Sequence, residues 1–141
     1  MLTKSCFSLH CRKVLRVLIF KLCIRNLVSG WGKIQHPGRS VNILQQAMLP
    51  IVDSNTCQER NLASMHLNVT DSMICAGHQI PSDKRSGCHG DSGGPLICRT
   101  DRTWVLQGVV SWGSIRCDIQ HAYTVFAKVS YFRDWIDKVV G

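Results

Sequence analysis

A glycine-rich stretch at residues 86–95 contains the residues of this sequence best suited to chemistry. It reads Ser-Gly-Cys-His-Gly-Asp-Ser-Gly-Gly-Pro, so that four glycines surround Ser92 and Asp91 directly precedes it. Because glycine tolerates positive φ and close backbone approach, such a loop can turn sharply and aim its own N–H groups at one point. Ser92 is therefore a candidate nucleophile, and the amides beside it, including that of Gly90, are candidate oxyanion donors. Ordinary surface turns have a similar composition, so the segments on either side of the loop are needed to tell a functional site from a simple turn.

Short strands are predicted on both sides of this loop. Runs rich in apolar and β-branched residues, bounded by glycine, proline or charged residues, favour strands over residues 27–32, 41–51, 73–77, 95–98, 104–112 and 123–129. A helical turn capped by Ser54 is expected at residues 54–60. Apolar residues at i, i+3, i+4 and i+7 from Phe132 predict a C-terminal helix capped by Ser130. This succession predicts an all-β antiparallel barrel with a terminal helix.

The formal charge of +8 is confined largely to the start of the chain. Residues 1–26 contain six basic side chains and no acidic one, whereas residues 27–141 contain eleven basic and nine acidic ones. The nearly balanced body gives no indication of nucleic-acid binding. We therefore divide the chain into a basic head, residues 1–26, and one domain, residues 27–141.

The head contains an apolar run at residues 14–24 that is short and interrupted by Arg16 and Lys21. A spanning helix needs about 20 apolar residues, and each central cation costs about 2.5–3.5 kcal/mol, so a membrane span is not expected. A signal peptide fits the basic start but not the internal charges or the missing cleavage site. The alternatives are a segment from another first exon or an imperfect gene model, and a basic membrane-surface peptide.

The chain has eight cysteines, an even and high number for 141 residues. This count indicates disulfides and an oxidising compartment. Metal binding is not expected, because neither a Cys-x-x-Cys pattern nor a paired-histidine spacing occurs. The triplet Asn68-Val69-Thr70 is a glycosylation acceptor pattern, which is compatible with secretion.

Residues 90–95, Gly-Asp-Ser-Gly-Gly-Pro, resemble the nucleophile loop of the trypsin/chymotrypsin-like serine endopeptidases. Further segments that resemble the family follow its order: Ser-Gly-Trp-Gly at 29–32, Leu-Gln-Gln-Ala-Met-Leu-Pro at 44–50, Met-Ile-Cys-Ala-Gly at 73–77 and Ser-Trp-Gly at 111–113. The resemblance covers residues 27–141 and looks closest to chymotrypsin and pancreatic elastase types. It implies the second barrel of that fold, a single six-stranded antiparallel Greek-key barrel, in a secreted protein without a cofactor.

The resemblance also implies roles for individual residues. Ser92 is the nucleophile, the N–H groups of Gly90 and Ser92 form the oxyanion hole, and Asp91 pairs with the α-amino group freed by activation. Ser86 matches the floor of the substrate pocket, where an uncharged residue disfavours cleavage after Arg or Lys.

The pocket walls are implied in the same way. Gly113 matches an open wall and Thr124 a narrowing one, while His89 matches the pocket rim. Backbone groups from Ser111 through Trp112 to Gly113 match the strand that pairs with an extended peptide substrate. Core packing alone is the alternative for Trp112.

Disulfides implied by the resemblance are Cys57–Cys75 and Cys88–Cys117. Cys98 should pair with a cysteine at the position of Asn26, for which Cys23 is the nearest substitute. Cys6 and Cys11 have no counterpart in the family.

The catalytic histidine and aspartate of the family come from its first barrel, and no Ala-Ala-His-Cys or Asp-Ile-Ala-Leu motif occurs here. Two hypotheses follow. In the first, the chain is part of a serine endopeptidase that cleaves polypeptides after uncharged or apolar residues, and it is inactive without an N-terminal barrel. In the second, it is a non-catalytic, protease-like module that binds protein partners.

Overall fold

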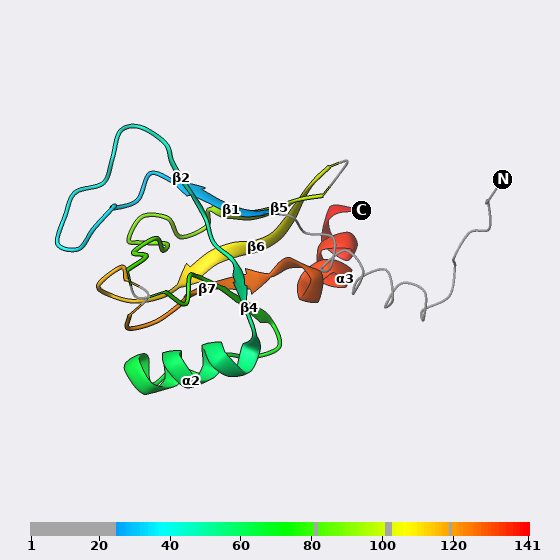
Figure 1. The fold of residues 1–141 in the computed structure, drawn as a ribbon. Coiled ribbons are helices and arrows are strands. Elements are labelled where there is room, and N and C mark those ends of the chain that lie inside the picture. Colours follow the sequence, from blue (N-terminus) through cyan, green and yellow to red (C-terminus); the bar gives the residue numbers. More distant parts are fainter. Residues whose placement is uncertain (1–24, 81, 101–102, 119) are drawn as a thin grey trace.

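The computed structural model describes residues 25–141 except residues 81, 101–102 and 119. One antiparallel sheet has the strand order β2-β1-β5-β6-β7-β4-β3 (Figure 1). The helices are α2 (Ser54–Met65), which lies beside the sheet, and α3 (Val129–Val140), which continues directly from the last strand. The strands are β1 (Arg25–Gly30), β2 (Gln45–Met48), β3 (Ile51–Val52), β4 (Met73–Ala76), β5 (Pro95–Arg99), β6 (Trp104–Trp112) and β7 (Thr124–Lys128).

The sheet closes into a barrel where β2 leads into β3. These strands lie at opposite ends of the strand order, yet only Leu49 and Pro50 separate them in the chain. The Leu49 N–H donates to the carbonyl of Asn26 (3.0 Å), and the Gly77 N–H donates to that of Pro50 (2.9 Å). Counted as one strand, β2 and β3 make a six-stranded barrel in which β5 lies beside β1, the arrangement of a Greek key. The predicted fold class is confirmed.

Two expected strand boundaries were wrong. Of the strand expected over residues 41–51, residues 41–44 lie outside any strand, and the rest is divided into β2 and β3, because Pro50 has no N–H to donate to a ladder and fixes its own φ. β1 begins at Arg25, and Asn26 pairs with Cys98 in the register with β5. This strand therefore begins two residues before the strand expected over residues 27–32, while residues 1–24 of the head lie outside the described residues.

Two apolar clusters arise from the alternation of side chains along the strands. Successive strand residues point to opposite faces of a sheet. On β7, accordingly, Phe126 joins the cluster inside the barrel and Val125 joins the cluster beneath α2. The inner cluster consists of Val28, Leu49, Ile74, Ala76, Leu96, Val110 and Phe126, and the outer one of Val52, Cys57, Cys75, Tyr123 and Val125.

The helix α2 begins one residue after its cap, which is Asp53 and not Ser54 as expected. A carboxylate oxygen of Asp53 accepts the Thr56 N–H at 2.9 Å, and this hydrogen bonding to Thr56 lowers the pKa of Asp53. The helix runs beyond the expected turn and ends at His66, whose φ of 57° is left-handed. Its side towards the barrel buries Cys57 and Asn61, so α2 is attached to the sheet mainly through these two residues.

The helix α3 begins directly at the end of β7, so Ser130 already lies inside the helix and does not cap it. The cap position is Lys128, which makes no side-chain cap hydrogen bond. Phe132, Trp135 and Val139 form an apolar stripe, with Trp135 64% exposed and Val139 65% exposed. None of the described segments buries this stripe, and we call it the α3 stripe.

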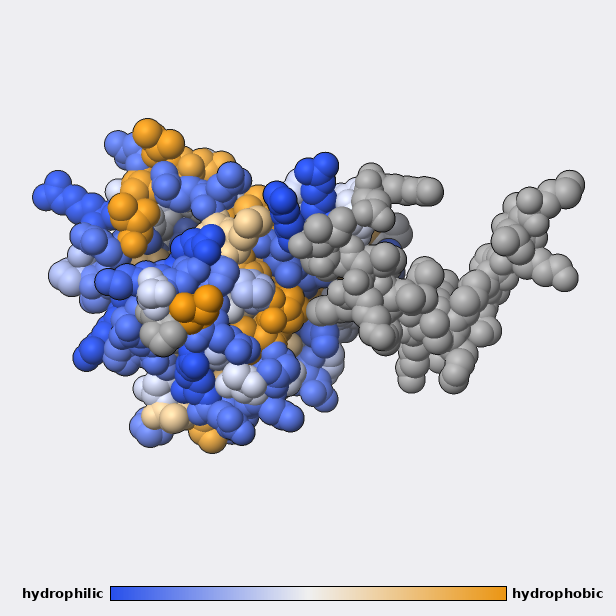
Figure 2. All heavy atoms as spheres, in the orientation of Figure 1, coloured by the Kyte–Doolittle hydropathy of each residue, from blue (hydrophilic) through white to orange (hydrophobic). Residues whose placement is uncertain are grey.

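A second group of exposed apolar side chains lies on the loop between β1 and β2. Figure 2 shows an orange patch at the upper left, over this loop, which carries the exposed Ile34, Ile43 and Leu44. Within the described part of the chain, neither helix has the length and apolar character needed to cross a bilayer.

Candidate active site

The glycine-rich loop leads into β5 and is fixed to β6 by backbone hydrogen bonds. The Gly93 N–H donates to the carbonyl of Val110 (2.9 Å), and the Val110 N–H donates to that of Gly94 (2.8 Å). Gly90 and Gly93 have φ angles of 98° and 82°, a region in which side chains other than glycine are strained. The loop conformation therefore requires glycine at both positions.

Ser92 lies exposed on this loop. No hydrogen bond joins its hydroxyl to any of the described residues, and the same holds for the backbone N–H groups of Gly90 and Ser92. A serine hydroxyl and two neighbouring donors are thus available to a substrate. Sequence reasoning selected these same groups for nucleophilic attack and oxyanion binding.

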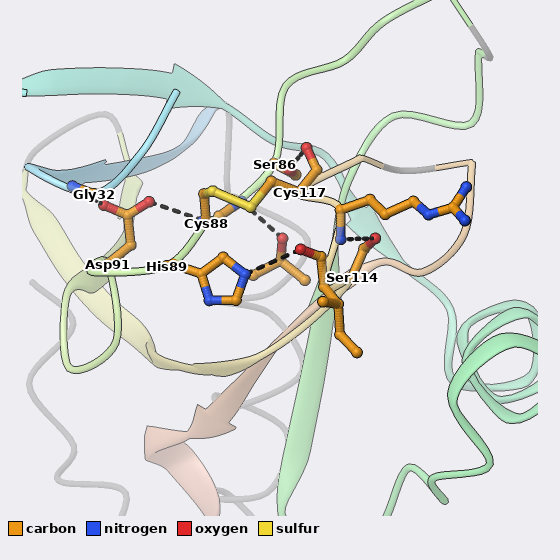
Figure 3. Close-up of a disulfide and its surroundings, with 11 residues drawn as sticks. Gly32, Ser86, Cys88, His89, Asp91, Ser114 and Cys117 are labelled. Atoms are coloured by element: carbon orange, nitrogen blue, oxygen red, sulfur yellow. Dashed lines mark hydrogen bonds between the residues drawn. A yellow bond between two sulfur atoms is a disulfide. The ribbon is translucent and has the colours of Figure 1, made fainter. Parts of the chain in front are cut away.

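Asp91 ties the nucleophile loop to the turn that follows β1. One carboxylate oxygen accepts the Gly32 N–H and the other accepts the Cys88 N–H, each at 2.9 Å (Figure 3). A Cβ at Gly32 would lie only 2.5 Å from the carboxylate, and one at Gly30 would also overlap it. The Ser-Gly-Trp-Gly segment therefore needs its glycines to let Asp91 approach. Both carboxylate oxygens are engaged by backbone amides, a pairing that sequence reasoning did not anticipate.

A pocket of about 210 Å³ opens beside Ser92. It brings together most of the residues predicted to bind substrate, and its lining contains no acidic or basic side chain other than that of His89. The lining residues are Gly87, Cys88, His89, Ser92, Val110, Ser111, Trp112, Gly113, Ser114, Ile115 and Thr124.

Thr124 closes one side of this pocket. Its hydroxyl oxygen accepts the buried Gly87 N–H at 2.9 Å, and the residue is only 2% exposed. A Cβ at Gly87 would meet the Thr124 methyl group at 2.8 Å, so the two chain segments are in close contact. Thr124 therefore forms a wall of the pocket and also holds the nucleophile loop in place through its hydrogen bond to Gly87.

Ser86 does not line the pocket beside Ser92. Its hydroxyl donates to the carbonyl of Cys117 at 2.8 Å, and the residue lines a neighbouring cavity of about 320 Å³ that also contains Asp91. The Cys88–Cys117 disulfide, with its Cα atoms 5.0 Å apart, joins the two loops at this point (Figure 3).

Both disulfides that the resemblance implies are formed. Cys57–Cys75 links α2 to β4, and Cys88–Cys117 links the nucleophile loop to the loop before β7. Cys98 is disulfide-bonded as well, and its expected partner, Cys23, lies outside the described residues. Among the residues that the structure describes, no cluster of three metal-binding side chains occurs.

None of the histidines in the described ranges is hydrogen-bonded to Ser92. His89 lines the pocket, but its Nε2 faces the carbonyl of Ile115 at 3.0 Å. His121 pairs with Asp118 at 2.6 Å, and His121 lines a separate cavity next to α2. The three-residue spacing of Asp118 and His121 was a signal for this pair that sequence reasoning did not use.

The loop before Ser86 is shaped by an ion pair. The Arg85 guanidinium donates to both oxygens of Asp83, with Nε 2.9 Å from Oδ1. This hydrogen bond lowers the pKa of Asp83 to about 2. The carboxylate therefore remains charged, and the loop keeps its ion pair, throughout the neutral range.

Comparison with known proteins agrees with this geometry. The family model described as trypsin matches residues 24–136. The chain belongs to the trypsin/chymotrypsin-like family of serine proteases.

Two mammalian relatives are 43% identical to the chain over 116 residues: chymotrypsin-like elastase family member 3B of Macaca mulatta and proproteinase E of Bos taurus. The clotting factor C of Tachypleus tridentatus is 42% identical over 120 residues. Each match covers 81% of this chain but only 43%, 44% and 12% of the respective relative. The chain thus spans less than half the length of the curated relatives that it matches.

Proposed function

We propose that this chain supplies the nucleophile half of a serine endopeptidase that cleaves polypeptides after uncharged or apolar residues. The observation that carries the proposal is an exposed Ser92 hydroxyl, without a hydrogen bond to the described residues, at the edge of a pocket that lacks acidic side chains. An acidic group in the pocket would be needed to pair with a lysine or arginine side chain of the substrate.

In this mechanism Ser92 Oγ attacks the scissile carbonyl carbon, while a base takes the hydroxyl proton. The carbonyl oxygen becomes an oxyanion, to which the N–H groups of Gly90 and Ser92 donate. Loss of one such donor in a serine protease costs about 2.7–4 kcal/mol of transition-state stabilisation. The substrate backbone pairs with residues 111–113 as an added strand.

The base and the aspartate that orients it belong to an N-terminal barrel outside residues 1–141. This assignment is supported by the positions of the described histidines, since each of those near a carboxylate lies away from the Ser92 pocket. The chain on its own is accordingly proposed to be inactive. In the assembled enzyme, Asp91 would give up its hydrogen bond from Gly32 and pair instead with the α-amino group that activation frees on the N-terminal barrel. This ion pair would order the oxyanion loop.

The pocket geometry bears on which uncharged residue is accepted. Gly113 adds no side chain to its wall, whereas Thr124 is held inwards by its bond to Gly87. The pocket is thus open on one side and narrow on the other, which leaves both large and small apolar side chains as candidates.

The second candidate function is a non-catalytic module that binds protein partners through the same cleft. The absence of a base next to Ser92 among the described residues favours it for the isolated chain. Retention of the glycines, Asp91 and Ser92 favours the endopeptidase, because a binding module has no need for that set. In either case the disulfides support an extracellular location.

A fluorophosphonate probe, which modifies activated serines, separates the two functions. We expect no labelling of the folded chain alone and labelling at Ser92 after assembly with the N-terminal half of proproteinase E, cleaved at its activation site so that the α-amino group that pairs with Asp91 is free. Ser92→Ala should abolish the signal, whereas Ser82→Ala, at an exposed serine of a neighbouring loop, should leave it unchanged. A folded assembly that takes up no probe would contradict the endopeptidase proposal and support the binding module instead.

A further inference from the structure

The loop between α2 and β4 carries a pattern that the proposed peptidase function does not use. Asn68-Val69-Thr70 is the only Asn-x-Ser/Thr triplet in the sequence. We propose that Asn68 is a site of N-linked glycosylation. The inference rests on the proposed extracellular location, because the acceptor pattern is modified in secreted proteins.

The triplet lies on the surface and is fixed at both of its ends. Asn68 and Thr70 are both exposed. Before them, the His66 N–H donates to the carbonyl of Leu62 at 3.0 Å and closes α2, and after them the Met73 N–H donates to the carbonyl of Thr70 at 3.0 Å. The Cys57–Cys75 disulfide also joins α2 to β4. The acceptor segment therefore lies on an exposed loop whose two ends are held in place by these hydrogen bonds and by the disulfide.

A glutamine of α2 orients the acceptor side chain. Gln58 Nε2 donates to Asn68 Oδ1 at 2.9 Å, and Gln58 Oε1 accepts the Val69 N–H at 2.5 Å. The amide oxygen of Asn68 is thereby turned towards α2. Its Nδ2 atom, which would carry the glycan, donates to none of the described residues.

The reaction transfers an oligosaccharide from a lipid pyrophosphate donor. A bond forms between Asn68 Nδ2 and C1 of the first sugar, and the bond from C1 to the pyrophosphate oxygen breaks. The lipid pyrophosphate leaves with the electron pair, and the amide nitrogen loses one proton. No oxidation or reduction takes place, and the glycosyl donor is the one co-reactant required.

The position of the site keeps a glycan out of the proposed active site. Residues 66–72 contribute nothing to the lining of the pocket beside Ser92 or of the cavity beside Asp91. Two exposed leucines are near this segment: Leu67 directly precedes Asn68, and Leu62 lies one turn of α2 after Gln58, which contacts Asn68. A bulky polar glycan at this position would shield them from other proteins.

The test is translation of residues 1–141, fused to the cleavable signal peptide of a secreted protein, in the presence of microsomes. We expect one mobility increment that peptide N-glycosidase F removes. Asn68→Gln and Thr70→Ala should abolish the increment, whereas Thr70→Ser, which preserves the acceptor pattern, should retain it.

A positive control comes from the chain itself. Leu44→Thr creates a second triplet at Asn42, on an exposed loop. It should add a second increment to the wild-type chain and give one increment in the Asn68→Gln background. An increment at Asn42 together with none at Asn68 would overturn the proposal. This result would leave the endopeptidase proposal untouched, since the fused signal peptide supplies translocation and Ser92 is tested separately by the fluorophosphonate probe.

Discussion

Replacing Asp91 with asparagine removes one of the two charged hydrogen bonds that connect the nucleophile loop to the turn after β1. Both carboxylate oxygens now accept backbone N–H groups at 2.9 Å, one from Gly32 and one from Cys88. In the Asp91→Asn variant an NH₂ group must face one of these N–H donors, since asparagine has a single side-chain oxygen. Either Gly32 or Cys88 then loses its acceptor.

The expected loss of stability is that of one of these two hydrogen bonds. Hydrogen bonds to charged groups contribute about 1.5–3 kcal/mol, so Asp91→Asn should lower the free energy of unfolding by about that amount. Since about 1.4 kcal/mol corresponds to a tenfold change in an equilibrium constant, the unfolding equilibrium constant should rise about 10-fold to 150-fold. Urea unfolding followed by tryptophan fluorescence, with the disulfides intact, measures the change.

The matched control is Asp71→Asn, which makes the same change of charge at an exposed carboxylate for which the structure gives no side-chain hydrogen bond among the described residues. It should alter the free energy of unfolding by less than about 0.5 kcal/mol. If the two variants unfold at the same urea concentration with the same slope, Asp91 does not support the loop in the way described.

Three further predictions concern α2, the loop before Ser86, and the surface. Asn61→Ala should lower the free energy of unfolding by about 1–3 kcal/mol, because the side chain pairs with the N–H and carbonyl of buried Tyr123 at 2.9 and 3.2 Å; chemical denaturation measures this. Arg85→Ala should raise the pKa of Asp83 from about 2 towards its ordinary value of 3.8, as followed by NMR titration. Since the folded-state pKa is the lower one, the ion pair stabilises the fold above about pH 4, and this contribution is lost as the pH falls through 2. We expect the exposed α3 stripe to promote self-association, so Trp135→Ser, which removes an indole that is 64% exposed on it, should reduce self-association in sedimentation velocity and should hardly change the unfolding free energy.

Each of these predictions has a control in a neighbouring residue. Asn55→Ala changes an exposed asparagine of α2 and should be nearly neutral. Lys84→Ala removes an exposed cation next to Arg85 and should leave the Asp83 titration where it is. Lys138→Ser changes the polar side of α3 and should not affect self-association. A control that reproduces the effect of its partner variant would contradict the corresponding explanation.

The barrel and the main features of the site could be predicted because they depend on local signals. Alternating apolar residues and glycine turns were enough to predict most of the strands, whereas the nucleophile loop and the two disulfides were predicted from the resemblance of the ordered motifs to the family. The helix caps were missed, because Asp53 and Ser54 are both good cap residues, and the end of β3 at Val52 places Asp53 in the cap position. Ser130 fits a cap pattern, but β7 continues into α3 without an intervening turn.

Apart from the Asp118–His121 pair, the site interactions that sequence reasoning missed join residues far apart in the chain. The Asp91 carboxylate contacts the turn 59 residues earlier, and the Thr124 hydroxyl contacts Gly87 37 residues earlier. No spacing rule connects such residues, since their contact depends on how the barrel closes. The outward presentation of Asn68 likewise depends on Gln58, which belongs to α2.

The joining of β2 to β3 also determines how copies of this protein could adhere to each other. An open sheet presents a row of unpaired main-chain groups onto which another chain can add as a further strand. Here the two terminal strands are separated by only two residues and are four and two residues long, so few main-chain groups are left unpaired for another chain to add to. Aggregates of this protein should therefore be amorphous, dissolve in mild detergent, and give no cross-β diffraction.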